Sequence, residues 1–114
     1  MQDEVQYKLL NLLEKKPEST QRELAKNLEI SVGKINYCLS ALIEKGHVKV
    51  RNFTNSNKKA AYAFLLTPKG IKQKAKVTIR FLQRKTEEYE QLKKEIEQLH
   101  QEVKYTEQRN ENGG

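Results

Sequence analysis

The stretch from Ile30 to Val48 combines a helix pattern with side chains suited to binding nucleic acid. Ser31 is a good N-cap because its hydroxyl can accept a hydrogen bond from a first-turn N–H, and Gly46 is suited to end the helix. Apolar residues at helical spacing predict a buried face made of Ile35, Leu39, Leu42 and Ile43. The remaining side chains can contact phosphates and base edges, and they are Lys34, Asn36, Tyr37 and Ser40. The alternative is an ordinary solvated helix face. The neighbouring elements must show which of the two interpretations applies.

Two further helices are predicted upstream. The first carries apolar residues at helical spacing and ends before Pro17; they are Val5, Leu9, Leu12 and Leu13. Thr20 to Glu23 forms a capping box with Thr20 as the N-cap. The short helix that follows is expected to bury Leu24, Ala25 and Leu28. A turn of about three residues then leads to the Ser31 helix, which is typical of a helix-turn-helix.

A β-hairpin is predicted after Gly46. Residues 47–53 largely alternate between polar and apolar types, as in a half-buried strand, and residues 61–66 form the returning strand. The turn between them is polar and basic, with Asn55, Asn57, Lys58 and Lys59. Three helices followed by a hairpin are the element order of a winged helix, and the hairpin tip is the wing.

A long helix is predicted to begin at Thr67 and Pro68, because threonine can cap a helix and proline suits its first position. Heptad spacing predicts a coiled-coil seam that holds two chains together, with its clearest positions at Leu82, Tyr89, Leu92, Ile96, Leu99 and Val103. Residues off this seam are expected to pack against the winged helix: Val77, Ile79 and Phe81. The resulting domains are a winged helix at 1–70, a dimerisation helix at 71–109 and a disordered tail at 110–114.

Composition and charge narrow the class of protein. The chain has 114 residues, of which 36% are hydrophobic and 32% charged, and a net charge of +7. Residues 67–86 contain seven basic and no acidic side chains, which suggests either a polyanion partner or a solvated helix face. Neither a membrane span nor a signal peptide is evident, and the single cysteine, Cys38, allows no internal disulfide. A cytoplasmic protein with no membrane partner is therefore expected.

Catalysis, metal binding and a cofactor are not expected. The sequence has no glycine-rich phosphate loop and no nucleophile with a matching base. His47 and His100 are far apart, and nothing around them has the spacing of a metal site. Cys38 is interpreted as a small core residue, with a redox sensor as the alternative.

The chain resembles the MarR family of bacterial winged-helix transcriptional regulators, and most closely its short group associated with exopolysaccharide gene clusters. The residues that carry the resemblance are Gly33 to Leu39, the asparagine-rich wing, and Leu66-Thr67-Pro68-Lys69-Gly70. Typical members have an Asp and an Arg in the wing, where this chain has Asn57, Lys58 and Lys59. They also have an additional N-terminal helix, whereas this chain begins at the first winged-helix helix, so a small-molecule effector is not expected.

The resemblance implies that residues of the Ser31 helix lie in or beside the major groove and that the wing reaches the minor groove or backbone. Together with the residue chemistry, it gives a set of expected DNA contacts: Thr20, Arg22, Ser31, Gly33, Lys34, Asn36, Tyr37, Ser40, Arg51, Asn55, Asn57, Lys58 and Lys59. For Tyr37, packing against the scaffold is the alternative.

The predicted fold class is mainly α (α+β), a winged helix-turn-helix followed by a long coiled-coil helix. The predicted function is a homodimeric regulator that binds double-stranded DNA sequence-specifically, with helix 31–45 in the major groove and wing 54–59 on the backbone or minor groove. Two alternatives stay open, a winged-helix adaptor that binds proteins and an architectural protein that binds nucleic acid without sequence preference.

Overall fold

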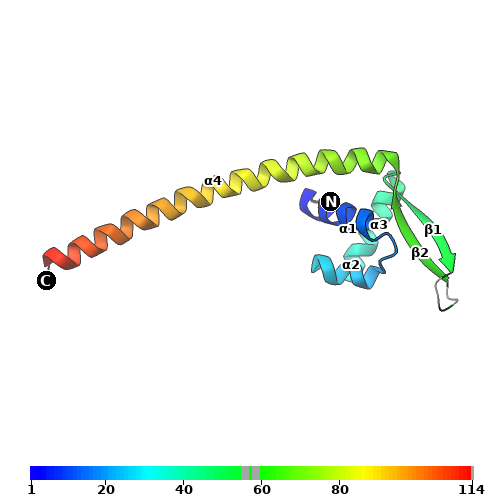
Figure 1. The fold of residues 1–114 in the computed structure, drawn as a ribbon, viewed down its shortest axis with the longest axis horizontal. Helices are drawn as coiled ribbons and strands as arrows, with labels where there is room; N and C mark the ends of the chain where they lie inside the picture. The colour runs from blue at the N-terminus through cyan, green and yellow to red at the C-terminus, as the bar shows by residue number, and fades with distance from the viewer. Residues whose placement is uncertain (55–56, 58–59, 114) are drawn as a thin grey trace. The chain divides into compact units, whose positions relative to one another are not determined.

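The computed structural model describes residues 1–54, 57 and 60–113, arranged in the order helix, helix, helix, hairpin, helix (Figure 1). The elements are α1 (Asp3–Lys15), α2 (Gln21–Leu28), α3 (Val32–Glu44), β1 (Val48–Thr54), β2 (Ala60–Leu66) and α4 (Pro68–Gly113). The chain divides into two compact units, Met1–Phe81 and Leu82–Gly114. This confirms the predicted fold class, three helices with a two-stranded wing and then a long helix.

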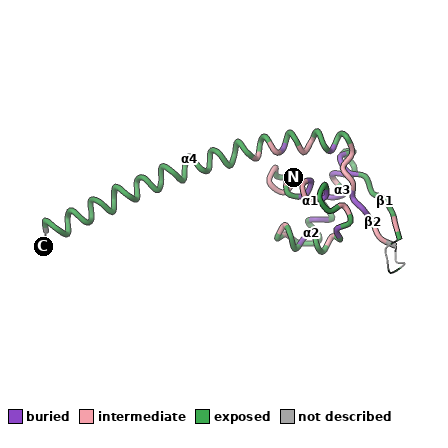
Figure 2. Tube along the Cα trace, viewed as in Figure 1, coloured by how far each residue is buried: buried purple, intermediate pink, exposed green. Residues whose placement is uncertain are grey.

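The core of the first unit is built from the apolar faces of α1, α2 and α3 together with residues of the hairpin and α4 (Figure 2). Leu9, Leu24, Ile35 and Leu42 have no exposed surface. The predicted inward faces are confirmed with one exception, since Ile43 is exposed. Ile43 lies about 80° around the helix from Ile35, at the edge of the buried face.

The hairpin pairs β1 with β2 in antiparallel register, with Val48 opposite Leu66 and Val50 opposite Phe64. Val48 and Phe64 are buried on this face, whereas Val50 is exposed although it lies opposite Phe64, and Ala63 is buried on the other face. The expected half-buried strand is therefore correct at its start and wrong toward the wing. The backbone N–H of Phe64 donates to the carbonyl of Pro17 over 2.9 Å, which attaches β2 to the loop between α1 and α2.

The start of α4 is fastened to the end of α3. The Thr67 hydroxyl caps α4 by accepting from the N–H of Gly70 at 3.0 Å, and it donates to the carbonyl of Gly46. The Thr67 N–H donates to the carbonyl of His47 at 3.1 Å. Gly46 adopts φ 76°, the left-handed conformation predicted for it. These bonds hold the first turn of α4 beside the end of α3.

The first turns of α4 also pack along α1. Val77 is fully buried, and the ring of Phe81 stacks on Tyr7 with centroids 5.2 Å apart, as expected for residues off the seam. Ile79 is exposed, because two residues from Val77 is about 200° around a helix. Arg80 forms a bidentate ion pair with Asp3, its Nε lying 3.0 Å from Oδ2, and this bond raises the pKa of the guanidinium.

The second unit is helical and exposed throughout. All described side chains from 82 to 112 are exposed, and the helix reaches Gly113, beyond the end expected at residue 109 (Figure 2). Residues 110–112 contain no proline or glycine, so nothing local ends the helix there. No helix in the described part of the chain is both long and apolar enough to cross a membrane.

Two glycines inside helices allow a matched test of the α3–α4 junction. A Cβ on Gly70 would lie 1.9 Å from the His47 carbonyl oxygen, whereas a Cβ on Gly33 would come no closer than 4.0 Å to the Ser31 hydroxyl. We expect Gly70→Ala to lower the free energy of unfolding by about 1–3 kcal/mol through overpacking. Gly33→Ala is expected to raise it by up to about 1 kcal/mol, because alanine favours helix. Urea unfolding of both variants measures this, and equal effects would contradict the predicted close approach.

His47 is predicted to make stability depend on pH. It is buried, and its Nδ1 has no hydrogen-bond partner among the described residues. Burial, followed by the charges of Lys69, Lys45 and Lys76, lowers the pKa of its imidazole below the usual 6.5. The unfolded chain therefore binds the proton more readily, and stability should fall as the pH drops below 6.5 toward the lowered native value.

Thermal unfolding between pH 7.5 and 5.5 tests this expectation. We expect His47→Gln to flatten the dependence on pH, because glutamine does not titrate. His100→Gln makes the same change at an exposed position of α4 and should retain the wild-type profile. If His47→Gln kept the wild-type dependence of stability on pH, a group other than His47 would be responsible for that dependence.

Candidate nucleic-acid interface

The outward face of α3 is a polar stripe directly opposite its buried stripe. Buried positions are Ile35, Cys38, Leu39 and Leu42, and at about 100° per residue the opposite positions are Gly33, Asn36, Tyr37 and Ser40. All four are exposed, and Tyr37 is 70% exposed. Packing of Tyr37 against the scaffold is therefore not what the structure shows. Lys34 is exposed on the flank of this stripe.

Gly33 is a glycine that the chain itself does not require. It lies in the first turn of α3, and the nearest atom to an added Cβ would be the Ser31 hydroxyl at 4.0 Å. Glycine inside a helix costs about 0.5–1 kcal/mol relative to alanine. A position that lacks a side chain at the start of an exposed polar face suits the close approach of another molecule.

Thr20 and Ser31 cap the two helices of the helix-turn-helix. The Thr20 hydroxyl accepts from the N–H of Glu23 at 3.1 Å, and the Ser31 hydroxyl accepts from the N–H of Lys34 at 3.0 Å. Both residues are exposed. Each hydroxyl accepts the capping bond, so its own proton can still be donated to a phosphate oxygen.

Asn36 is held to α2 by a bond that the sequence did not indicate. Its Nδ2 donates to Oε1 of Gln21 over 3.3 Å, and Gln21 is the first residue of α2. The sequence places Gln21 directly after the N-cap Thr20 but does not indicate its partner. The structure thus brings Gln21 to the edge of the predicted contact surface.

The remaining predicted contacts lie on α2 and the wing. Arg22 is exposed on α2, and Arg51 is exposed on β1 opposite Ala63. Asn57 is exposed in the turn of the hairpin. Three of the predicted DNA contacts lie outside the described residues, and they stay predictions: Asn55, Lys58 and Lys59.

Much of the basic run at 67–86 is engaged within the protein. Lys69 donates to the carbonyl of Lys45 at 2.9 Å, and Lys74 pairs with Glu14 of α1 at 3.2 Å. Arg80 pairs with Asp3, also on α1. These contacts give part of the run a structural role in attaching α4 to the first unit.

Cys38 occupies the buried side of α3 as predicted for a core residue. Burial raises the pKa of its thiol above the usual value, with Lys34 opposing this effect. A buried thiol with a raised pKa is poorly reactive, which argues against a redox sensor. Within the described residues, no group of three histidine, cysteine, aspartate or glutamate side chains is arranged to hold a metal ion.

Residues 2–49 match a family model described as winged helix-turn-helix DNA-binding. This region comprises α1, α2 and α3, with their caps and core. The family is one of DNA-binding domains rather than enzymes, in agreement with the expectation that the chain is not an enzyme. No curated protein sequence matches the chain.

Three solved structures share the fold at low sequence identity. PcaV, a transcriptional regulator from Streptomyces coelicolor solved with its natural ligand, has a TM-score of 0.56 and 20% identity over 68% of this chain and 54% of its own. MarR from Staphylococcus aureus, in complex with salicylate and kanamycin, has a TM-score of 0.52 and 23% identity over 71% and 53%. A mutant of MepR from S. aureus has a TM-score of 0.56 and 21% identity over 88% and 78%.

This chain therefore spans about half the length of PcaV and MarR. At these identities the likeness concerns the fold, while the family model concerns the helices that carry the polar stripe of α3. Together they show that the first unit has the winged helix-turn-helix fold, and that its residues 2–49 are similar to a family of DNA-binding domains.

Proposed function

We propose that the chain is a MarR-like transcriptional regulator, of the short exopolysaccharide-associated type, that binds double-stranded DNA sequence-specifically as a homodimer. The observation that carries the proposal is the exposed polar stripe of α3, which begins at Gly33 in the first turn of the helix. Lys34 and the N-terminus of α3 supply positive charge for a phosphate, and Asn36 and Tyr37 supply groups for base edges.

The wing and α2 extend this surface. Arg22 and Arg51 are exposed, and the wing turn contains Lys58 and Lys59 in the sequence. About five or six phosphate contacts per subunit would make affinity fall steeply with salt. We assign the backbone or minor groove to the wing and the major groove to α3.

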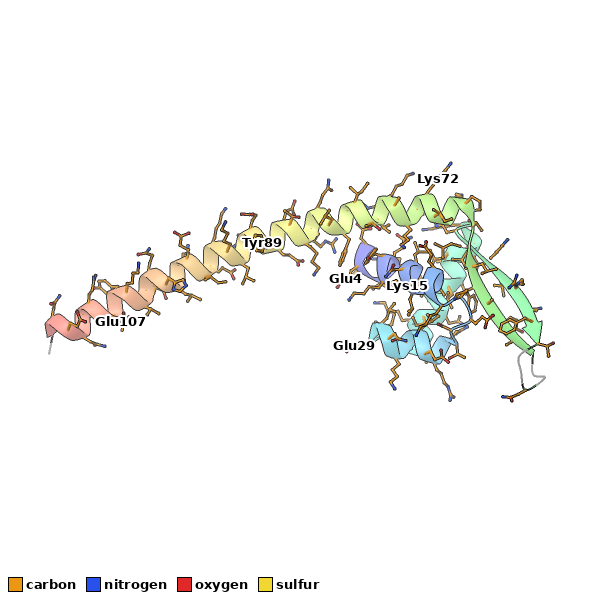
Figure 3. The ribbon with its side chains drawn as sticks, in the orientation of Figure 1. Glu4, Lys15, Glu29, Lys72, Tyr89 and Glu107 are labelled. Atoms are coloured by element: carbon orange, nitrogen blue, oxygen red, sulfur yellow. The ribbon has the colours of Figure 1, made fainter. Side chains whose placement is uncertain are left out.

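Self-association through α4 is supported by the apolar seam of the second unit. Its members are 46–64% exposed in the single chain: Leu82, Tyr89, Leu92, Ile96, Leu99 and Val103. The seam covers most of a helix about 48 Å long, at about 1.5 Å per residue over residues 82–113. Figure 3 shows the side chains of this segment, with Tyr89 and Glu107 labelled. An exposed apolar stripe in heptad register is the surface that a second copy covers in a coiled coil.

DNA binding is tested by selecting bound sequences from a random duplex pool with the full chain. We expect a near-palindromic site with half-sites about 34 Å apart. Lys34→Ala should reduce the slope of log affinity against log salt by about 1 per half-site, while Asn36→Ala should relax the preference at particular bases. Equal binding of random and selected duplex at all salt concentrations would contradict a specific regulator.

Gly33→Ala gives a sharper version of this test, because it should stabilise the fold while placing a methyl group at the proposed point of approach. Weaker binding by this variant could not be attributed to unfolding. Unchanged DNA binding in Gly33→Ala, Lys34→Ala and Asn36→Ala would instead favour the adaptor that binds proteins.

Dimerisation is tested by sedimentation equilibrium at micromolar concentration. We expect the wild type to be a dimer and Leu92→Asp/Ile96→Asp to be a monomer, since two carboxylates would be buried in the seam. The matched control Lys94→Asp/Gln101→Asp introduces two aspartates on the opposite side of the same helix and should remain a dimer. A monomeric wild type would exclude this part of the proposal.

A further inference from the structure

The amide groups of Gln21 and Asn36 link the two helices of the helix-turn-helix. Asn36 Nδ2 donates to Gln21 Oε1 at 3.3 Å, across 15 positions of sequence. Asn36 lies in the exposed stripe of α3, whereas Gln21 is half-buried at the start of α2. The more constrained of the two side chains is therefore the acceptor.

In the structure this bond places Nδ2 of the Asn36 amide toward Gln21. The terminal torsion of asparagine is broad and roughly two-fold, so an isolated exposed amide exchanges its oxygen and nitrogen readily. With Gln21 Oε1 as the facing atom, the Asn36 nitrogen is favoured on that side because two carbonyl oxygens would repel. The second N–H and Oδ1 of Asn36 are left for other partners.

An N–H donor beside an oxygen acceptor matches the major-groove edge of adenine. Adenine offers N7 as an acceptor and the N6 amino group as a donor, whereas guanine offers two acceptors, N7 and O6. Gln21 is only the acceptor in its bond with Asn36, because it contributes its amide oxygen and neither N–H. Its own amide N–H groups can therefore bind water or a phosphate oxygen.

We propose that Gln21 is a positioning residue that fixes the Asn36 amide for the recognition of adenine. The inference rests on the proposed function and adds to it the base that Asn36 reads and the residue that orients it. In water the bond competes with solvent. Within a groove that excludes water, the same bond is stronger, and a pre-oriented amide loses less freedom on binding.

The test begins with the site selected by the wild-type chain. The A·T pair whose preference is lost in Asn36→Ala is located first, and its adenine is then replaced by 7-deazaadenine, which lacks only the N7 acceptor. We expect wild-type affinity to fall about fivefold on this replacement, the factor that corresponds to one net hydrogen bond. Gln21→Met keeps the length of the side chain but removes its acceptor, and it should lose most of this discrimination.

The double variant Gln21→Met/Asn36→Ala should discriminate between the adenine and 7-deazaadenine duplexes no less than Asn36→Ala alone. The reason is that Gln21 acts only through the Asn36 amide, which is already missing in the single variant. Gln83→Met makes the same change at an exposed position of α4 and should retain the full fivefold effect. Melting temperatures of all variants confirm that each is folded.

Two results would overturn the inference while leaving the proposed function intact. One is a selected site at which Asn36→Ala alters no A·T preference. The other is a Gln21→Met variant that binds every duplex more weakly but still discriminates against 7-deazaadenine, as a purely structural role would predict. A wild-type chain that selects no sequence would overturn both proposals together.

Discussion

The contact between the start of α4 and the turn after α3 is the constraint on which the rest of the first unit depends. Gly70 lies so close to the His47 carbonyl that a side chain at this position has no room. The hydroxyl of Thr67 bridges the two segments, capping α4 and binding the carbonyl of Gly46. The hairpin begins and ends at this junction, since Val48 pairs with Leu66. The position of the first turns of α4 beside the turn after α3 thus follows from one close approach.

Local sequence signals determined most of the elements. Thr20, Ser31 and Thr67 are caps that each accept a backbone N–H in the structure, and Gly46 has the left-handed conformation expected of it. These features depend on residues within one turn of each other, so a single sequence contains the information. The same reasoning predicted the buried sides of α1, α2 and α3 apart from Ile43.

Features that depend on tertiary contacts were less predictable. Ile79 is exposed because α4 packs through the side that carries Val77, and the sequence does not tell which side of α4 meets its neighbours. The exposure of Val50 likewise depends on which part of the hairpin the helices cover. In the candidate interface, the types and outward positions of Lys34, Asn36 and Tyr37 followed from the sequence. The bond from Asn36 to Gln21 did not, because it joins two side chains from different helices.

The hydrogen bond from Phe64 to Pro17 has a consequence for the solubility of the wing. A two-stranded hairpin has two edges, and unpaired backbone groups on an edge invite pairing with strands of other chains. The Pro17 carbonyl satisfies the Phe64 N–H on the outer side of β2. Proline itself has no N–H to offer, so the pairing cannot continue through it. The loop before α2 therefore occupies one hydrogen-bonding group on the edge of β2, which another strand would otherwise use. It does not itself offer an N–H at Pro17 to which a further strand could pair.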